Sequence, residues 1–435
     1  MLSTLHWLII AAYIVAPVVA TAYAVSEATH QRARAAARLF VSVLIGSFLG
    51  IGATLGNAFL NRGHVGPWQF FLAIYFATSM MLVLNVFDAL VRRISIWFSD
   101  WLEKLSGDDT QKPSGLRRAL ASLGQMFIAS LRVVVLIAVG LPYMLSVAAT
   151  YRPKVTTVGD PRSVLGYGYT EVQFRSTDGL RLAGWWIPAS KRPVRGLATS
   201  RPADFGDKTV ILCHGFASDK ATQLSLVRDL LPAGYNVLAF DFRAHGESAG
   251  QLTSLGDLER RDVLGAVRWL RQNHPEQSKK IFGVGATMGA AALIAAAADP
   301  SDEGNAIEAI AVYDAYDDLG SLARDLSRQS FASPMDWIMR YIGLPFASLQ
   351  TGTNLSNFKP ASLISRLWPR PVLVIHGTHD SFVDFSRGSN LFDAATQPKR
   401  RLWLLGQDER HTVRDEGAAE TVRDFFDTAR PRQII

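Results

Sequence analysis

The sequence predicts an α/β protein in which a mostly parallel central sheet is flanked by helices, preceded by about four transmembrane helices. From about residue 165 onward, short apolar runs that end in glycine turns alternate with segments of helical pattern, which is typical of parallel sheets. The first 150 residues hold most of the apolar excess of a 435-residue chain that is 49% hydrophobic, with a mean hydropathy of +0.12. The composition therefore indicates a membrane region followed by an α/β domain.

The membrane prediction depends on four apolar runs, each long enough to cross ~30 Å of hydrocarbon as a helix. These runs are Leu5–Val25, Leu39–Leu60, Trp68–Leu90 and Met126–Ala149. Helices buried in a soluble bundle keep a polar stripe, which these runs lack. The charges within them, Asp88 and Arg132, lie near run ends, where side chains snorkel to the interface. A signal peptide is the alternative for the first run, but that run has no basic residues before it, so a retained helix is favoured.

Basic residues in the connectors predict the orientation of the chain in the membrane. The first and third connectors are rich in basic residues, namely Arg32, Arg34, Arg38, Arg92, Arg93, Lys104, Lys112, Arg117 and Arg118. The second connector has only Arg62, and no Lys or Arg precedes the first run. The positive-inside rule then places connectors one and three in the cytoplasm. We therefore expect a multi-pass protein of the inner or plasma membrane with its C-terminal domain outside the cytoplasm, although Arg152, Lys154 and Arg162 favour the opposite orientation.

The most informative stretch of the C-terminal part is Gly285-Ala286-Thr287-Met288-Gly289. It follows the apolar run Ile281–Val284 and opens an alanine-rich segment, Gly289–Ala298, of helical pattern. Strand, sharp turn and small-residue helix form the context of a nucleophile elbow, in which G-x-S-x-G places a serine hydroxyl above a sheet. Here Thr287 stands at the centre. A glycine-rich turn of an ordinary doubly wound protein would explain the pentapeptide alone.

Three further segments appear in the order that such a site requires. Upstream, the apolar run Val210–Cys213 leads into His214-Gly215-Phe216, where the backbone N–H of Phe216 and that of Met288 are candidates for an oxyanion hole. Downstream, the apolar run Val372–Ile375 leads into a loop containing Asp380. His411 follows the apolar segment Leu402–Leu405. The chain order is nucleophile, acid and then histidine.

With these anchors, residues 166–435 resemble an α/β-hydrolase of the serine aminopeptidase-like or dienelactone hydrolase-like kind. Arg243-Ala244-His245-Gly246 stands where that family usually has Arg-Gly-His-Gly. The expected organisation is a membrane region over residues 1–150, a linker over 151–165 and the hydrolase domain over 166–435. Aromatic and apolar residues between about 316 and 360 predict a small cap over the site, although ordinary helix packing explains them equally well.

The resemblance implies a hydrolase that cleaves an acyl ester, thioester or amide of a small-molecule substrate, which includes lipid-like substrates. Thr287 would be the nucleophile, His411 the base and Asp380 the acid, with Phe216 and Met288 donating to the oxyanion. Asp314 is a second candidate acid. Structural roles are expected for His376 and His379, and likewise for Arg243, His245 and Glu247.

Thr287 also supports a different class of function. The elbow residue takes a positive φ, which is strained for a β-branched side chain, and the threonine hydroxyl is hindered. The alternative is a catalytically silent hydrolase-fold domain that binds a ligand or partner for the membrane region. Transport by the four helices themselves is disfavoured because they carry almost no intramembrane charge.

Other features limit the remaining classes. The single cysteine, Cys213, excludes an internal disulfide and is expected in a buried strand. The formal charge of +7 suits an anionic membrane surface, and no basic patch with interleaved aromatics indicates nucleic acid. No glycine fingerprint for a cofactor and no metal-ligand cluster is apparent, so we expect neither.

Overall fold

The structure is a computed structural model that describes residues 141–151, 156–190, 206–330, 335–407 and 415–429, with the single residues 93, 96, 97, 154 and 333. The chain divides into two compact units, Met1–Leu145 and Ser146–Ile435. The first three predicted membrane spans lie outside the described residues, and the fourth enters them only at Leu141. Within the described ranges, no helix combines the length and the apolar character needed to cross a bilayer.

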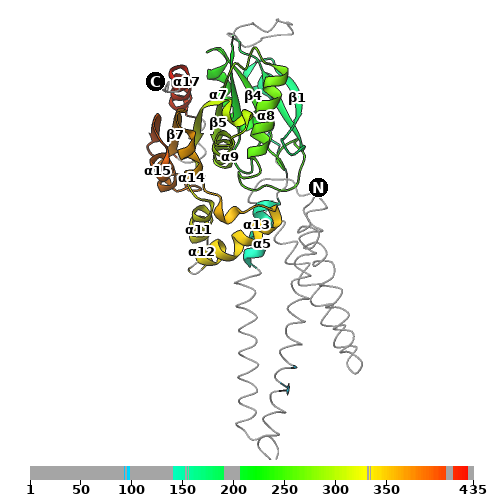
Figure 1. Ribbon diagram of the computed structural model, residues 1–435, viewed down its shortest axis with the longest axis vertical. Coiled ribbons are helices and arrows are strands. Elements are labelled where there is room, and N and C mark those ends of the chain that lie inside the picture. The colour runs from blue at the N-terminus through cyan, green and yellow to red at the C-terminus, as the bar shows by residue number, and fades with distance from the viewer. Residues whose placement is uncertain are drawn as a thin grey trace, which may run out of the picture. The chain divides into compact units, whose positions relative to one another are not determined.

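The second unit is built on an eight-stranded sheet with the strand order β1-β2-β4-β3-β5-β6-β7-β8 (Figure 1). Strand β2 pairs antiparallel with both β1 and β4, and every other pairing is parallel. The prediction of a mostly parallel sheet is therefore confirmed. The strands are β1 (Thr170–Arg175), β2 (Arg181–Ile187), β3 (Lys208–Cys213), β4 (Tyr235–Phe240), β5 (Lys280–Ala286), β6 (Ile307–Tyr313), β7 (Val372–Gly377) and β8 (Lys399–Leu404).

Helices cover both faces of this sheet, as parallel strands require. Every residue of β4 is buried, and so is every residue of β7, which explains their continuous apolar runs. The helices of the domain are α6 (Pro161–Leu165), α7 (Leu224–Leu230), α8 (Arg260–Asn273), α9 (Met288–Ala297), α10 (Asp302–Asn305), α14 (Pro360–Ile364), α15 (Phe385–Ala394) and α17 (Glu416–Thr428).

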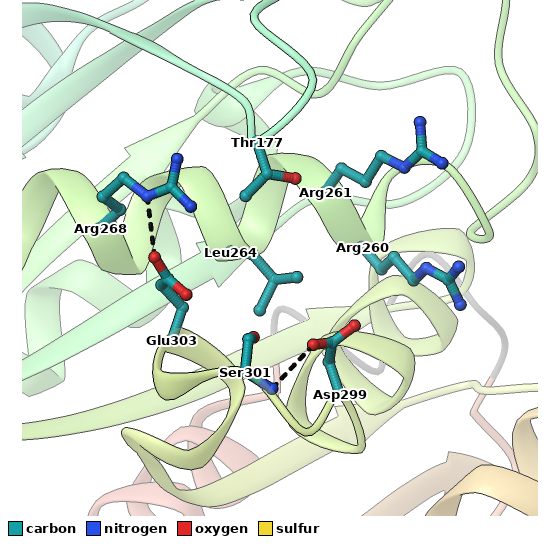
Figure 2. Close-up of a pocket in the computed structure, with 8 residues that line it drawn as sticks. All are labelled: Thr177, Arg260, Arg261, Leu264, Arg268, Asp299, Ser301 and Glu303. Carbon is teal, nitrogen blue, oxygen red and sulfur yellow. Dashed lines mark hydrogen bonds and ion pairs between the residues drawn. The ribbon is translucent and has the colours of Figure 1, made fainter.

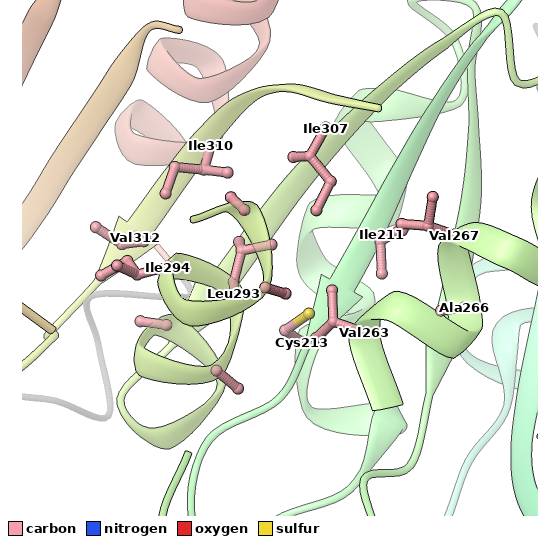
Figure 3. Packing of buried hydrophobic residues seen from close by; sticks show 14 of the residues in the cluster. Ile211, Cys213, Val263, Ala266, Val267, Leu293, Ile294, Ile307, Ile310 and Val312 are labelled. Carbon is pink, nitrogen blue, oxygen red and sulfur yellow. The ribbon is translucent and has the colours of Figure 1, made fainter. Parts of the chain in front are cut away.

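Two hydrophobic clusters lie on opposite faces of the sheet. Helices α8 and α9 pack on one face, where Val263 and Leu293 meet Ile211 and Ile310 of the strands (Figure 3). Cys213 lies in this cluster, as predicted, and is fully buried. Helices α7 and α17 cover the other face. The alanine-rich sequence of α9 lets this helix lie close to β5 and β6.

A group of helices separates β6 from β7 in the chain and lies at one end of the sheet (Figure 1). It contains α11 (Leu319–Ser330), α12 (Met335–Ile338), the π-helical turn η4 (Met339–Gly343) and α13 (Leu344–Thr351). We call these four elements the cap, since they occupy the predicted cap range of about 316–360. A third buried cluster joins the cap to α9 and to Val383 beyond β7. Helix α5 (Leu141–Thr150) reaches the cap through its last residues.

Candidate active site

Thr287 lies in a sharp turn between β5 and α9, with φ +47° and ψ −109°. The two glycines around it are required by close approach. A Cβ at Gly289 would lie 2.3 Å from the carbonyl oxygen of Cys213, and one at Gly285 would lie 2.7 Å from Cα of Ala290. Such distances are far below van der Waals contact. The pentapeptide therefore forms the strand-turn-helix elbow that the sequence predicts.

The positive φ of Thr287 carries backbone strain, because its β-branched side chain rarely adopts this region. The cost of such a conformation is about 1–3 kcal/mol. The surrounding sheet holds the turn in place, since the Thr287 N–H donates to the carbonyl of Tyr313 at 2.9 Å. The strain is thus maintained at Thr287, the predicted nucleophile.

The loop after β3 faces the Thr287 side chain. The backbone N–H of Phe216 donates to Oγ1 of Thr287 at 3.1 Å. A Cβ at Gly215 would lie 2.8 Å from the same oxygen, so only glycine lets the loop approach this closely. One of the two predicted oxyanion donors is therefore adjacent to the predicted nucleophile.

His214 fixes the conformation of this loop. Its Nε2 accepts from the N–H of Phe242 at 3.0 Å, and its Nδ1 lies 2.8 Å from the carbonyl oxygen of Gly215. An N–H donor on one side and a carbonyl on the other select the neutral tautomer with the proton on Nδ1. Burial lowers the pKa of His214 to about 4. The imidazole is thus a structural support beneath Phe216.

Met288, the second predicted donor, is the first residue of α9 and is buried. The first N–H groups of a helix have no carbonyl partner in the preceding turn, so they are available to an oxyanion. Thr253 Oγ1 lies 3.4 Å from the Met288 sulfur. The loop that carries Thr253 is held by Glu259, which is fully buried and accepts from Thr253, Ser254 and Gly256. Glu259 was not identified from the sequence, because its hydrogen-bonding partners surround its carboxylate only in the folded loop.

Asp380 lies in the loop after β7 and is buried. Its Oδ1 accepts from the backbone N–H groups of Phe382 and Val383, both at 2.8 Å. These bonds favour the ionised carboxylate and fix its orientation. The N–H of His379 in the same loop donates to the carbonyl of Gln407 at 3.0 Å, which joins the acid loop to the chain just after β8.

His411 lies outside the described residues. The positions on either side of its segment are tied together, because Gln407 Nε2 donates to Oδ2 of Asp415 at 2.6 Å. Asp415 also caps α17 by accepting from the Ala418 N–H at 2.9 Å. The chain thus leaves β8 and enters α17 beside the Asp380 loop.

Asp314 and His376 lie next to Asp380. One ligand atom from each of the three residues falls within 4.8 Å of the others, a cluster that was not apparent because Asp314 lies 62 residues before His376 in the sequence. Oδ1 of Asp314 accepts from the N–H of Gly377 at 3.1 Å. Nε2 of His376 lies 2.9 Å from the carbonyl oxygen of Val383, so this nitrogen carries the proton and has no lone pair for a metal. Burial lowers the pKa of His376, which keeps it neutral.

Two aromatic rings border the same region. The rings of Phe216 and Phe382 stack with a centroid distance of 6.3 Å, and both are partly buried. Phe216 adjoins the Thr287 hydroxyl and Phe382 adjoins Asp380, so the pair joins the two sides of the site. An apolar wall at this position suits the acyl part of a substrate. Phe382 is a second residue that sequence reasoning missed.

Two of the residues predicted to have structural roles, Arg243 and Glu247, form ion pairs. Arg243 is buried and donates to Asp262 at 2.6 Å and to Asp178 at 2.9 Å. Glu247 accepts from Nζ of Lys220 at 2.7 Å. Lys220 also donates to the fully buried Asp241 at 2.7 Å, so this lysine joins the loop after β3 to the loop after β4.

A cavity of about 250 Å³ opens elsewhere, between α8, α10 and the turn that joins β1 to β2 (Figure 2). It is lined by Thr177, Arg260, Arg261, Leu264, Arg268, Asp299, Ser301 and Glu303. Asp299 lies just beyond the end of α9 and Thr287 just before its start, a separation of about 18 Å at 1.5 Å per residue. Arg268 is paired with Glu303 at 2.8 Å. This cavity is therefore separate from the candidate active site.

Comparison with known proteins agrees with the geometry. The family model described as serine aminopeptidase, S33, matches residues 206–329. The Bacillus subtilis protein YqkD is 31% identical over 231 residues, which cover 50% of this chain and 71% of YqkD. The chain belongs to the α/β-hydrolase superfamily and shares a family with YqkD.

Two further similarities each cover nearly two thirds of the chain. The alpha/beta hydrolase domain-containing protein aho-3 of Caenorhabditis elegans is 24% identical over 277 residues, covering 63% of this chain and 74% of aho-3. A crystal structure of the Pyrococcus furiosus esterase Pf2001 aligns with a TM-score of 0.51 and 27% identity, over 65% of this chain and 98% of the esterase. The chain is thus a hydrolase-fold protein of the esterase and aminopeptidase type.

Proposed function

We propose that this protein is a membrane-anchored hydrolase that cleaves an acyl ester, thioester or amide through Thr287, Asp380 and His411. The observation that carries the proposal is the hydrogen bond from the Phe216 N–H to the Thr287 hydroxyl oxygen, 3.1 Å long, at a strained elbow. This contact supports Thr287 as the nucleophile and the Phe216 N–H as an oxyanion donor. A generic strand-to-helix turn requires no such arrangement.

The reaction follows from the roles of these groups. Thr287 Oγ attacks the acyl carbonyl carbon while His411 accepts the hydroxyl proton, and Asp380 stabilises the resulting imidazolium. The carbonyl oxygen becomes an oxyanion that accepts from the N–H groups of Phe216 and Met288. His411 then donates its proton to the leaving alcohol, thiol or amine as the tetrahedral intermediate collapses. Water hydrolyses the acyl-enzyme by the same steps in reverse order.

The substrate class is supported by the surroundings of Thr287. Phe216 and Phe382 form an apolar wall at the site, and Pf2001, which shares the fold, is named an esterase. An apolar acyl group fits this wall better than a charged one. Residues 1–150 supply the membrane attachment, and the basic connectors favour an extracytoplasmic hydrolase domain.

Active-site labelling tests the proposal directly. The purified full chain is treated with a fluorophosphonate probe, and the labelled residue is identified by peptide mass spectrometry. Labelling at Thr287 that disappears in Thr287→Ala and His411→Ala supports the enzyme. An intact fold without labelling and without hydrolysis of p-nitrophenyl esters contradicts it.

A catalytically silent hydrolase-fold domain is the second candidate. The observation that favours it is threonine at the elbow with φ +47°, where the motif usually has serine. The extra methyl of threonine crowds the site, and its β-branched side chain strains the backbone at this φ. In this case the domain binds a ligand or partner without turnover. The absence of activity in a folded Thr287→Ser variant would favour this function.

A further inference from the structure

An exposed apolar stripe runs along one face of the cap. Trp337, Tyr341, Pro345 and Leu349 are spaced four residues apart and are all exposed. The exposed fractions of the three large side chains are 59% for Trp337, 56% for Tyr341 and 42% for Leu349. The Trp337 and Tyr341 rings contact each other at a centroid distance of 4.8 Å. These four residues are the apolar stripe.

The π-helical turn η4 aligns the apolar stripe. Residues four apart advance slightly past a full turn in an α-helix and fall slightly short of one in the wider π-helix. Because η4 lies between α12 and α13, its angular deficit offsets the angular excess of the α-helical turns, and the four residues stay on one face. The buried face of the same helices, with Met335, Leu344 and Ala347, already packs into the protein. The apolar stripe is therefore a second apolar face, which a helix exposed only to water does not need.

Helix α5 indicates what covers this face. Thr150 Oγ1 donates to Oε1 of Gln350 at 2.7 Å, and Nε2 of Gln350 donates to Ser146 Oγ at 2.9 Å. Thr150 is fully buried, and Gln350 directly follows Leu349 of the apolar stripe. The fourth predicted membrane span ends at Ala149, between the two α5 residues of this clamp. Chain continuity thus holds α13 beside the point where that span would leave the bilayer.

The chemistry of the apolar stripe suits this level of a membrane. Tryptophan and tyrosine are enriched in the interfacial layer, where an apolar ring and a polar edge are both accommodated. Neighbouring charges are already paired, as in Arg328–Asp336 at 2.7 Å and Arg340–Asp318 at 3.6 Å. Attraction would therefore come from apolar contact and would not require anionic lipids.

We infer that the apolar stripe rests in the interfacial layer of the lipid bilayer, an inference that rests on the membrane attachment proposed above. The cap packs directly on the nucleophile helix through Ala291, and on the acid loop through Val383. Contact of the apolar stripe with lipid therefore places the active site at the bilayer surface. The substrate class that this geometry selects is an amphiphile with an acyl chain, presented from the membrane.

Depth-sensitive fluorescence quenching tests the inference on the full chain. Trp337→Cys and Leu349→Cys are each labelled with an environment-sensitive fluorophore and reconstituted in phosphatidylcholine vesicles with or without brominated acyl chains. The native Cys213 is buried, so the wild type measures background labelling. Glu276→Cys is the matched control, because it lies just before β5, at the end of the sheet away from the cap.

We expect blue-shifted emission and quenching by brominated lipid at 337 and 349, and neither at 276. Unquenched labels at 337 and 349 in a protein that floats with the vesicles would overturn the inference while leaving the membrane attachment intact. Blue-shifted emission without quenching, accompanied by cross-linking between copies at 337, would assign the apolar stripe to a second copy of the chain. Recovery of the wild type in the aqueous fraction without detergent would instead contradict the attachment. Quenching at 337 on addition of vesicles would then still support the inference.

Discussion

The backbone N–H of Phe216 donates to the hydroxyl oxygen of Thr287 across 3.1 Å, although the two residues are 71 positions apart. The contact depends on Gly215, since a Cβ there would lie 2.8 Å from the same oxygen. The Thr287 side chain has little freedom to move away, because a β-branched residue in a strained backbone has few rotamers. The loop that carries Phe216 and the side chain of Thr287 therefore constrain each other.

Gly215→Ala should impair catalysis more than folding. The new methyl pushes against Thr287 Oγ1 and moves the Phe216 N–H, so we expect a loss approaching the ~10²–10³ in kcat that follows removal of one oxyanion donor. Ester hydrolysis and thermal melting of the variant are compared with those of Gly168→Ala. A methyl at Gly168 meets nothing within 4 Å, so that variant should match the wild type. Equal activity of both variants would mean that the Phe216 loop is not part of the site.

Substitution of the two buried acids, Asp380 and Asp314, should affect catalysis very differently. In Asp380→Asn the Oδ1 bonds from Phe382 and Val383 are kept, so the protein should fold and yet lose about 10⁴ in kcat, as expected for a triad acid. Asp314→Asn keeps its bond from the Gly377 N–H and should lose little. Steady-state kinetics with p-nitrophenyl esters measure both. The reverse ranking would make Asp314 the acid of the triad.

The fold was accessible from the sequence because its signals are local. The buried parallel strands read as apolar runs, and the glycines of the elbow mark backbone contacts that exclude any side chain. The neighbourhood of Asp314, His376 and Asp380 arises because β6 and β7 are adjacent in the sheet, which no sequence spacing shows. Strands β1 and β2 were not predicted; β1 is largely exposed and its six residues carry only a weak apolar pattern. The apolar stripe escaped detection because residues spaced four apart share one face here only through a π-helical turn, which the sequence does not reveal.

Stability should fall as the pH is lowered from 6.5 to 4. The folded state keeps His214 neutral to about pH 4, whereas the unfolded imidazole binds a proton near pH 6.5. The unfolded state therefore binds more protons than the folded state between pH 6.5 and 4. The contribution of neutral His214 to the free energy of unfolding, fully present above pH 6.5, declines by up to about 3 kcal/mol over this range. Thermal melting at pH 7.5 and 5.0 compares the wild type with His214→Gln. The variant should be less stable at pH 7.5 but less sensitive to acid, and equal sensitivity would exclude His214 as the cause.

The predicted orientation of the domain is based on the basic residues of the first and third connectors. We expect the C-terminus to lie outside the cytoplasm, so a C-terminal alkaline phosphatase fusion should be active and a fluorescent protein fusion dark. The two fusions are expressed in parallel at matched levels. A fluorescent fusion with an inactive phosphatase would reverse the orientation without changing the number of spans.

Replacing the nucleophile itself gives the most direct test of the site. Thr287→Ser removes one methyl and relieves the strain of a β-branched residue at φ +47°, while Asp380 and His411 stay in place. We therefore expect higher activity on short acyl esters, together with a stability gain of at most the ~1–3 kcal/mol of such strain. Thr287→Ala and His411→Ala should each abolish the wild-type activity, since members of a triad act as a unit.

Hydrolysis of p-nitrophenyl esters is measured for the wild type and the three variants, with thermal melting to verify that each is folded. Higher activity of Thr287→Ser than of the wild type, with both alanine variants inactive, supports a working triad. A folded serine variant that is as inactive as Thr287→Ala shows that the site lacks a functional base or oxyanion hole. That outcome would favour the second candidate, a catalytically silent domain that binds a ligand or partner, because replacing the hindered threonine with serine would not have produced activity.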